Sequence, residues 1–156
     1  MARRRKPSPG SAKSERPARS GENAAGDYLI FVSHATADKW VATQICEKLD
    51  AAGAKTFRDD RDLDGGDKIP EEIIRQITRC KEFVVLLTPR SVDRPWVLLE
   101  VGMALRNGRR TRIVPILYHV GIDPIPEMIK DRKAIDLNEF ENYVAEVGRK
   151  LKRLMP

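Results

Sequence analysis

Short apolar runs alternate with amphipathic helical segments along most of this 156-residue chain, and this alternation limits its fold more than any other feature. The runs at 28–32 and 83–87 are apolar at every position, which is typical of strands buried on both faces of a parallel sheet. The segments at 38–52 and 70–80 instead place their apolar residues three or four apart, as helices that pack on a sheet do. The alternation predicts an α/β domain with right-handed crossovers.

The complete pattern predicts a flavodoxin-like three-layer sandwich with a central five-stranded parallel sheet. Pro115 predicts that the fourth strand lies at an edge or contains a bulge, because proline cannot donate to a sheet ladder. Asn138 followed by Glu141 predicts a capping box at the start of the last helix. We expect strands at 28–32, 55–57, 83–87, 112–118 and 134–137, and helices at 38–52, 70–80, 95–107 and 138–154.

A single charge interrupts the predicted helix at 95–107, where every residue from 97 to 105 except Glu100 is apolar or glycine. Trp96 precedes Glu100 by four residues, so a helix places both side chains on one face. A buried carboxylate is costly unless another group pairs with it. Glu100 can therefore serve chemistry, or it can form a structural ion pair for which Arg58 and Arg94 are the candidates.

Three segments that follow predicted strands should meet at one edge of the sheet. They are residues 33–36, the polar loop at 58–68, and the segment at 88–100 that contains Glu100. In open parallel sheets, ligands bind outside the carboxyl ends of the strands. We therefore expect the functional site at this edge.

The charge of the chain is concentrated at its N-terminus. Seven basic and two acidic residues give residues 1–26 a charge of +5, out of +6 for the whole chain. Proline, serine, glycine and alanine leave this segment without an apolar face, so we expect a disordered basic leader at 1–26 and one domain at 27–156. The domain is almost neutral, so we expect no nucleic-acid contact from it and at most a weak one through the leader.

Neither export nor membrane insertion is indicated by the sequence. The N-terminal charges are not followed by the apolar region of a secretory signal, and no run approaches the roughly 20 apolar residues of a membrane span. Cys46 and Cys80 fall within or at the ends of predicted helices, where we expect reduced, packed thiols. These features predict a cytoplasmic protein with no membrane partner.

Three sequence motifs occur at the predicted edge of the sheet in a fixed order. They are FVSH at 31–34 followed by Ala37-Asp38, LDGG at 63–66, and LTP at 87–89 followed by Ser91 and by WVLLE at 96–100. Together with the strand order, they resemble the TIR (Toll/interleukin-1 receptor/resistance) domain, in its bacterial NAD-cleaving form. The resemblance covers roughly residues 27–154.

The resemblance implies cleavage of NAD⁺ at the nicotinamide–ribose bond, with Glu100 at the position of the catalytic glutamate. Nicotinamide is already a cationic leaving group, so its departure needs no general acid. It leaves a ribosyl oxocarbenium ion, which a buried carboxylate stabilises while also orienting the ribose hydroxyls. NAD⁺ is then the substrate, and we expect neither a cofactor nor a metal, because no Cys/His cluster offers a site for one.

The resemblance also implies NAD-binding residues around Glu100. The end of the first strand should offer a hydroxyl and backbone N–H groups, and the indole of Trp96 should both wall the pocket and pack the helix. His34 tempts a general-base interpretation, but a lone histidine at a strand end is more often a hydrogen-bonded spacer. Asp64 matches an acidic position that lies beside the nicotinamide end in some NAD-cleaving relatives, or it is simply an exposed loop carboxylate. The predicted substrate-binding residues are Ser33, His34, Ala35, Asp64 and Trp96.

The loop at 58–68 holds five aspartates, yet it lacks the ligand spacing of a calcium loop, and its glycine pair fits no phosphate-binding motif. In the family, this loop gates the site and contacts neighbouring subunits. Arg94-Pro95 replaces the small hydroxyl residue that often precedes the tryptophan, so Arg94 can meet a phosphate or a neighbour's acidic loop, or it can narrow the site. Assembly roles are therefore predicted for Arg58, Leu63, Gly65, Gly66, Lys68 and Arg94.

The leading hypothesis is an NAD⁺ nucleosidase, a hydrolase or cyclase, that releases nicotinamide with ADP-ribose or a cyclic isomer. The family implies homotypic self-association, an upstream activator or downstream effector protein, and a role in antiphage defence or immune-type signalling. A non-catalytic TIR–TIR adaptor is the alternative, although an adaptor has no need for Glu100. A phospho-acceptor receiver domain is excluded, because the first strand ends in Ser33-His34 where a receiver needs an acidic pair.

Overall fold

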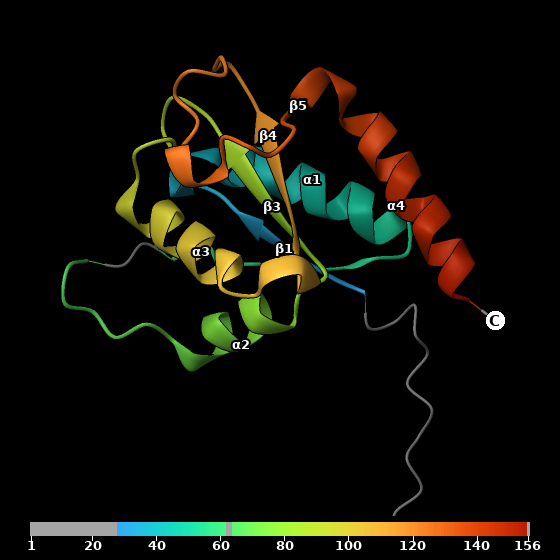
Figure 1. Cartoon of the computed structure of the whole chain (residues 1–156), viewed down its shortest axis with the longest axis horizontal. Helices are drawn as coiled ribbons and strands as arrows, with labels where there is room; N and C mark the ends of the chain where they lie inside the picture. The colour runs from blue at the N-terminus through green and yellow to red at the C-terminus, as the bar shows by residue number, and fades with distance from the viewer. Residues whose placement is uncertain (1–27, 62–63, 156) are drawn as a thin grey trace, which may run out of the picture.

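Five parallel strands form the central sheet in the computed structural model, which describes residues 28–61 and 64–155 (Figure 1). The strand order is β2-β1-β3-β4-β5. The chain therefore passes from β1 to β2 at one edge of the sheet, and then crosses back to β3 on the other side of β1 and continues through β4 to β5 at the opposite edge. This topology confirms the predicted α/β fold with a parallel sheet, whereas the predicted leader at 1–26 lies outside the described residues. The strands are β1 (Leu29–Ser33), β2 (Lys55–Arg58), β3 (Glu82–Leu87), β4 (Arg112–Leu117) and β5 (Ile135–Asp136).

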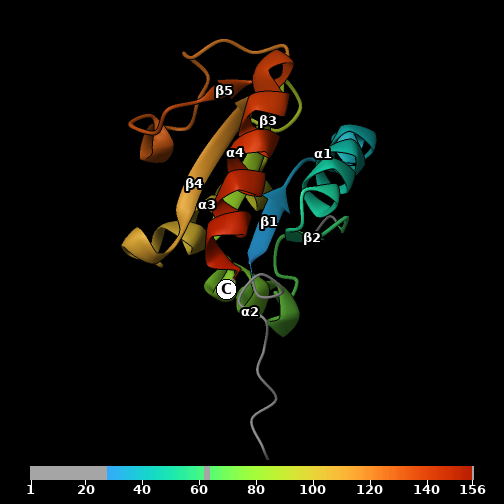
Figure 2. The ribbon, with the colours of Figure 1, turned by 90° about the vertical axis from the view of Figure 1, so that its right-hand side faces the viewer.

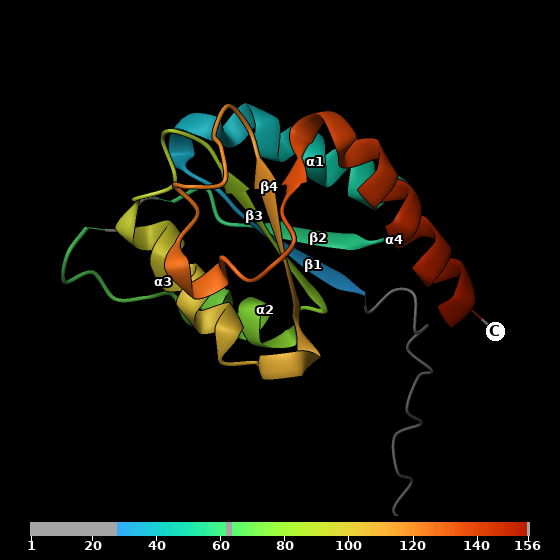
Figure 3. The ribbon, with the colours of Figure 1, turned by 45° about the horizontal axis from the view of Figure 1, so that its top comes forward.

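Helices cover both faces of the sheet and complete the predicted flavodoxin-like three-layer sandwich. Helices α2 and α3 pack on one face of the sheet, whereas α1 and α4 pack on the other. Helices α1 and α4 lie above the sheet in Figure 3, and α4 lies in front of the sheet in Figure 2. The α-helices are α1 (Lys39–Ala51), α2 (Glu71–Arg79), α3 (Pro95–Leu105) and α4 (Phe140–Leu154). Short 3₁₀ turns occupy η1 (Thr36–Asp38), η2 (Gly108–Arg110), η3 (Glu127–Ile129) and η4 (Leu137–Glu139).

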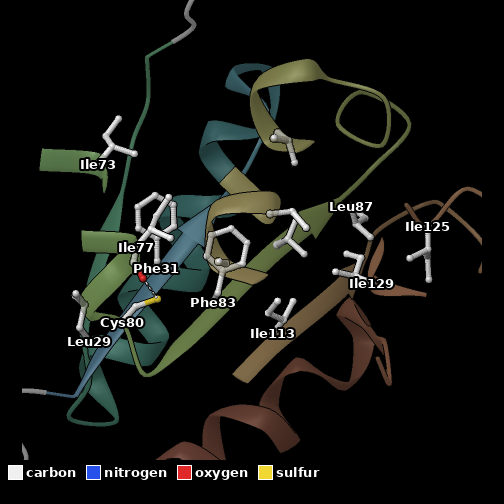
Figure 4. Close-up of a cluster of buried hydrophobic side chains, with 14 of the residues drawn as sticks. Leu29, Phe31, Ile73, Ile77, Cys80, Phe83, Leu87, Ile113, Ile125 and Ile129 are labelled. Carbon is white, nitrogen blue, oxygen red and sulfur yellow. Dashed lines mark hydrogen bonds between the residues drawn. The ribbon is translucent and has the colours of Figure 1, made fainter. Parts of the chain in front are cut away.

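The alternation of side chains along the strands divides the core into two clusters. In β1, Phe31 belongs to the cluster under α2 and α3, while Ile30 and Val32 belong to the cluster under α1 and α4. The ring of Phe31 stacks on Phe83 with centroids 5.4 Å apart, at the centre of the first cluster (Figure 4). Both faces of the strand are therefore buried, which explains why its sequence is apolar at every position.

Both cysteines of the chain are free and buried, as predicted. Cys80 follows α2 and donates its thiol to the carbonyl of Ile77 at 3.1 Å (Figure 4). Burial raises the pKa of Cys80 to about 11 and also raises the pKa of Cys46. The two thiols therefore act as packed core groups and not as nucleophiles.

Pro115 does not lie in an edge strand, so that part of the prediction is wrong. Strand β4 has β3 on one side and β5 on the other, and it pairs with β3 without a bulge over six consecutive residues. The short strand β5 contacts only Ile116 and Leu117 of β4. Proline is tolerated because its position precedes the part of β4 that β5 covers.

Asn138 does not cap the last helix, so the predicted capping box is also wrong. The chain first forms the 3₁₀ turn η4, and Asp136 accepts the backbone N–H of Asn138 at 2.9 Å. Helix α4 then begins with no side-chain cap, and Glu141 pairs with Lys48 on α1. The extra turn shifts the helix start by two residues, beyond the reach of the predicted cap.

A second buried glutamate, which the sequence analysis did not identify, begins β3 at the opposite end of the sheet from the candidate site. Glu82 is 1% exposed and accepts hydrogen bonds from the hydroxyls of Tyr28 and Tyr143. Lys150 donates to it at 2.9 Å, and the guanidinium of Arg112 lies 3.8 Å away. Burial, together with the charge of Glu82, raises the pKa of both tyrosines. Glu82 is thus the fully partnered counterpart of Glu100.

Candidate active site

Glu100 lies on the inner face of α3, where its side chain meets the end of β1. It is 1% exposed, and the hydroxyl of Ser33 donates a hydrogen bond to its Oε2. The alternative of a structural ion pair is wrong for both proposed partners. Arg58 contacts Asp60 at 3.5 Å, and Arg94 donates to the carbonyl of Arg90.

This environment strongly favours the protonated form of Glu100. Burial raises its pKa to about 8, against the opposing effect of the Ser33 hydrogen bond, and the negative charge of Asp59 raises it further. At neutral pH the closed site therefore holds mostly a neutral carboxyl group. The ionised form becomes favourable when a positive charge enters the site.

Asp59 is a site residue that the sequence analysis missed. Strands β1 and β2 pair in parallel with Phe31 opposite Phe57 and Val32 opposite Arg58, so Ser33 and Asp59 are the next facing pair. The rings of Phe31 and Phe57 contact each other in the α2–α3 cluster, and side chains two residues further along a strand point to the same face. The register could have identified Asp59, had β2 not been predicted one residue too short.

His34 belongs to a charged cluster beside the site. Its side chain is fully buried, and its Nε2 lies 3.1 Å from Asp60, which also contacts Lys39 and Arg58. Neither ring nitrogen has a partner with hydrogen-bond geometry, and burial lowers the pKa of the imidazole. The histidine thus lies between the end of β1 and Asp60, as a spacer would, but without the hydrogen bond that the spacer interpretation expects.

Trp96 lies one turn before Glu100 and has both of the positions expected of it. It packs against the core cluster under α2 and α3, and it also lines a cavity of about 250 Å³. Its indole N–H is buried without a hydrogen-bond partner among the residues that the structure describes. The other residues of the cavity wall are Asp64, Gly65, Gly66, Asp67, Ile69, Pro95 and Leu99.

The remaining predicted residues divide between this cavity and the surrounding surface. Asp64 is exposed on the cavity rim, and the buried Ala35 uses its carbonyl to accept the N–H of Asp38 at 2.9 Å. Lys68 and Arg94 are exposed, whereas Leu63 lies outside the described residues. The structure thus joins Ser33 to Glu100 by a hydrogen bond, with Trp96 one helical turn away, and Asp64 and the glycine pair line the same cavity as Trp96.

The hydroxyl residues of the third motif have structural partners. Thr88 donates to the buried carboxylate of Asp38, which joins the turn after β3 to η1. Ser91 donates to the carbonyl of Leu86 at 2.7 Å and accepts the N–H of Thr88 at 2.9 Å. These bonds hold the connection that leads into α3, so the motif fixes the position of the start of the helix that carries Trp96 and Glu100.

The residues that the structure describes bear on both metal binding and membrane spanning. Among residues 28–61 and 64–155, no group of three or more His, Cys, Asp or Glu is arranged to hold a metal ion. Within the same residues, no helix combines the length and apolar character that crossing a membrane requires.

Replacing Ser33 by alanine should raise the pKa of Glu100, because the hydroxyl bond is the contact that opposes the effect of burial. Carbon-13 NMR of the labelled glutamate carboxyls would follow the titration, with the Glu100 signal identified by its loss in Glu100→Gln. Thr78→Ala is the control, since that exposed hydroxyl donates to the carbonyl of Ile74 on α2 and not to a carboxyl group. A Glu100 midpoint that stays constant or falls in Ser33→Ala would contradict the prediction.

Comparison with known proteins identifies the class to which this fold and site belong. The family model described as TIR domain matches residues 30–152. The chain therefore belongs to the TIR domain family, which confirms the resemblance seen in the three motifs.

The most similar proteins include enzymes that act on NAD⁺. The probable 2′ cyclic ADP-D-ribose synthase BdTIR of Brachypodium distachyon is 26% identical over 128 residues, which are 80% of this chain and 56% of that protein. The NAD(+) hydrolase PdTIR of Paracoccus denitrificans is 30% identical over 105 residues, 65% of this chain and 35% of that protein. This chain thus spans about half and about a third, respectively, of the length of these relatives.

A solved structure supports the fold independently. The TIR domain of the Toll-related receptor TRR-2 from Hydra magnipapillata matches with a TM-score of 0.58 at 24% identity. The match covers 80% of this chain and 94% of that domain.

Proposed function

We propose that this TIR domain is an NAD⁺ nucleosidase in which Glu100 is the catalytic carboxylate. One observation carries the proposal: Glu100 is 1% exposed in an apolar helix, and Ser33 is its hydrogen-bond partner. A buried carboxyl group without a countercharge destabilises the fold, and a positively charged reaction centre would supply that countercharge. The named activities of BdTIR and PdTIR support NAD⁺ as the source of this charge.

The proposed reaction breaks the bond between the ribose anomeric carbon and the nicotinamide nitrogen. The bonding electron pair stays with nitrogen, so nicotinamide leaves neutral and the positive charge passes to the ribose. The ionised form of Glu100 stabilises that charge. Attack by water, with loss of a proton, then gives ADP-ribose, whereas attack by a nucleophile within the same molecule gives a cyclic isomer.

The site must open before NAD⁺ can reach Glu100. The cavity beside Trp96 is about 250 Å³, smaller than the roughly 300–1,000 Å³ of typical ligand pockets. The segment at 64–69 forms its outer wall, and Gly66 adopts φ +93°, a left-handed conformation that favours glycine. Leu99 lines the same cavity and is 42% exposed, so its apolar side chain is accessible to a second copy of the domain. We propose that the wall moves when copies of the domain associate at this position.

A non-catalytic interaction module is the second candidate. Its support is an apolar groove of about 280 Å³ between α1 and α4, bordered by Trp40, whose exposed fraction is 73%. Contiguous exposed apolar surface can mark a site of interaction with another protein. The two candidates differ in what Glu100 must do, since an adaptor does not require its ionisation.

Replacing Glu100 by glutamine tests the proposed function. We expect the full chain to release nicotinamide from NAD⁺, and the Glu100→Gln variant to be slower by about 100-fold or more, because loss of one preorganised electrostatic group has this effect. Products should be separated by chromatography across a range of protein concentrations, with and without a crowding agent. Glu127→Gln is the matched control, because that carboxylate is exposed and pairs only with Lys130.

Two outcomes of this assay would contradict the proposal. Equal turnover by the Glu100→Gln variant would remove Glu100 from the mechanism. Absence of turnover at every concentration, with binding between copies retained, would favour the interaction module.

The biological setting is also a proposal. The bacterial character of the three motifs supports a cytoplasmic role in antiphage defence or immune-type signalling, with an upstream activator or a downstream effector protein as partner. Phage challenge of a host that carries either the wild-type gene or the Glu100→Gln variant would test this role. If the wild-type and Glu100→Gln genes protected the host equally, defence would not depend on the proposed reaction.

A further inference from the structure

We propose that Asp59 is a second carboxylate of the Glu100 site, and that its ion pair with Arg61 sets the negative charge that the site presents to a substrate. Asp59 follows β2 directly and faces Ser33 by register. Ser33 in turn donates to Glu100. Ser33 is therefore bonded to Glu100 and lies one residue beyond the last paired residues of β1 and β2, at the same end of the sheet as Asp59.

The burial and bonding of Asp59 mark it as an internal residue and not as part of the exposed loop. It is 8% exposed, while Asp64 and Asp67 further along the chain are exposed. Arg61 donates to its Oδ1 at 2.7 Å. Within residues 28–61 and 64–155, the other oxygen, Oδ2, is buried with no hydrogen-bond partner, so half of the carboxylate remains available to a further partner.

Arg61 is the reversible component of this arrangement. Its side chain is 54% exposed, whereas that of Asp59 is 5% exposed, so solvent and neighbouring groups reach the cation but not the anion. When Arg61 bonds Asp59, the two charges largely cancel. When Arg61 turns away, the site contains an uncompensated carboxylate beside Glu100.

The remaining charged groups near this end of the sheet have other partners or are exposed. His34, Lys39 and Arg58 contact Asp60, and Asp38 accepts the hydroxyl of Thr88. The charged side chains on α2 and at the ends of α3 are exposed; they are Glu71, Glu72, Arg75, Arg79, Arg94 and Arg106. Among the described residues, Asp59 is thus the buried carboxylate whose charge acts on Glu100.

A pair of carboxyl groups has a consequence for substrate binding, which rests on the proposed function. Burial is the main reason why Glu100 keeps a proton in the free site, and repulsion between the two negative charges adds to this effect. A substrate with a positively charged ring removes that repulsion and expels the proton. Binding of NAD⁺ should therefore release a proton, whereas NADH, whose nicotinamide ring is neutral, should not.

Two variants of opposite charge effect test the pair without using turnover. Asp59→Asn keeps an acceptor for Arg61 but removes the negative charge, so the titration midpoint of Glu100 should fall by about half a pH unit or more. Arg61→Gln leaves Asp59 uncompensated, so the midpoint should rise. Carbon-13 NMR of the glutamate carboxyls in the full chain reads both midpoints, and Asp93→Asn, an exposed carboxylate before α3, should leave the midpoint unchanged.

Shifts of opposite sign would support the proposal, because a general disturbance of packing moves both variants the same way. An unchanged midpoint in Asp59→Asn, or shifts of the same sign in both variants, would overturn it. Calorimetric titration of NAD⁺ in buffers of different ionisation enthalpy measures the released proton separately. Failure of NAD⁺ to bind would count against the proposed function, while the carboxyl titration would still decide the role of Asp59.

Discussion

Replacing Glu100 by glutamine should make the folded protein more stable, and the gain should grow as the pH rises. The folded protein keeps the Glu100 proton up to a pKa of about 8, whereas the unfolded chain releases it near 4.5. The stability of the wild-type protein is therefore intact below pH 4.5, falls as the pH rises through 8, and is constant above that. Glutamine has no proton to lose, so the variant should be more stable by about 3 kcal/mol at pH 7.

Urea unfolding at pH 5, 7 and 8.5 measures this difference. The two proteins should be close in free energy of unfolding at pH 5 and should diverge at the higher values. Glu127→Gln, an exposed carboxylate, provides the reference for a change that does not involve burial. A Glu100→Gln variant that is less stable than wild type at pH 8.5 would show that the carboxylate is compensated in a way that this geometry does not contain.

The same substitution at Glu82 should have the opposite effect. Glu82 is as buried as Glu100, but Tyr28, Tyr143 and Lys150 all donate to it. Replacing it by glutamine removes the charge that these donors satisfy and places an amide N–H₂ among groups that are themselves donors. We expect a loss of about 2 kcal/mol or more, less than for a fully buried pair because Lys150 is partly exposed.

Urea unfolding of Glu82→Gln at pH 7 checks this loss, and Lys150→Met separates the ion pair from the two tyrosine bonds. The lysine variant should lose less than the glutamate variant, since both hydroxyls still reach Glu82. Equal stability of Glu82→Gln and wild type would mean that the desolvation penalty of the buried Glu82 charge equals the stabilisation by its hydrogen bonds and ion pair. The two isosteric substitutions, at Glu100 and Glu82, thus distinguish a strained carboxylate from a satisfied one.

Apolar periodicity was enough to predict the layers, the parallel sheet and the helix that carries Trp96 and Glu100. These features depend on which faces of the helices and strands are buried, and the spacing of apolar residues in the sequence indicates those faces. The local errors at Pro115 and Asn138 have a different origin. Each depended on a neighbour that the pattern does not specify: a two-residue strand beside β4, and a 3₁₀ turn before α4.

The candidate site was only partly predictable for a similar reason. Glu100 was conspicuous because it is alone among apolar residues, whereas Asp59 is one of five aspartates in a polar stretch. Its burial follows from the pairing of β1 with β2, and such register depends on contacts between distant residues. Glu82 escaped notice because its partners come from β4, α4 and the residue before β1.

The exclusion of Glu100 from water also has a consequence for how selection acts on this protein. A cell removes proteins in proportion to how often they unfold, so abundance follows stability. A glutamine variant that lacks the proposed activity would persist longer than the wild-type protein, and selection for abundance alone would favour it. A population that retains glutamate at position 100 would therefore do so because the carboxylate is used, and comparing the two alleles in competition would measure the benefit of that use.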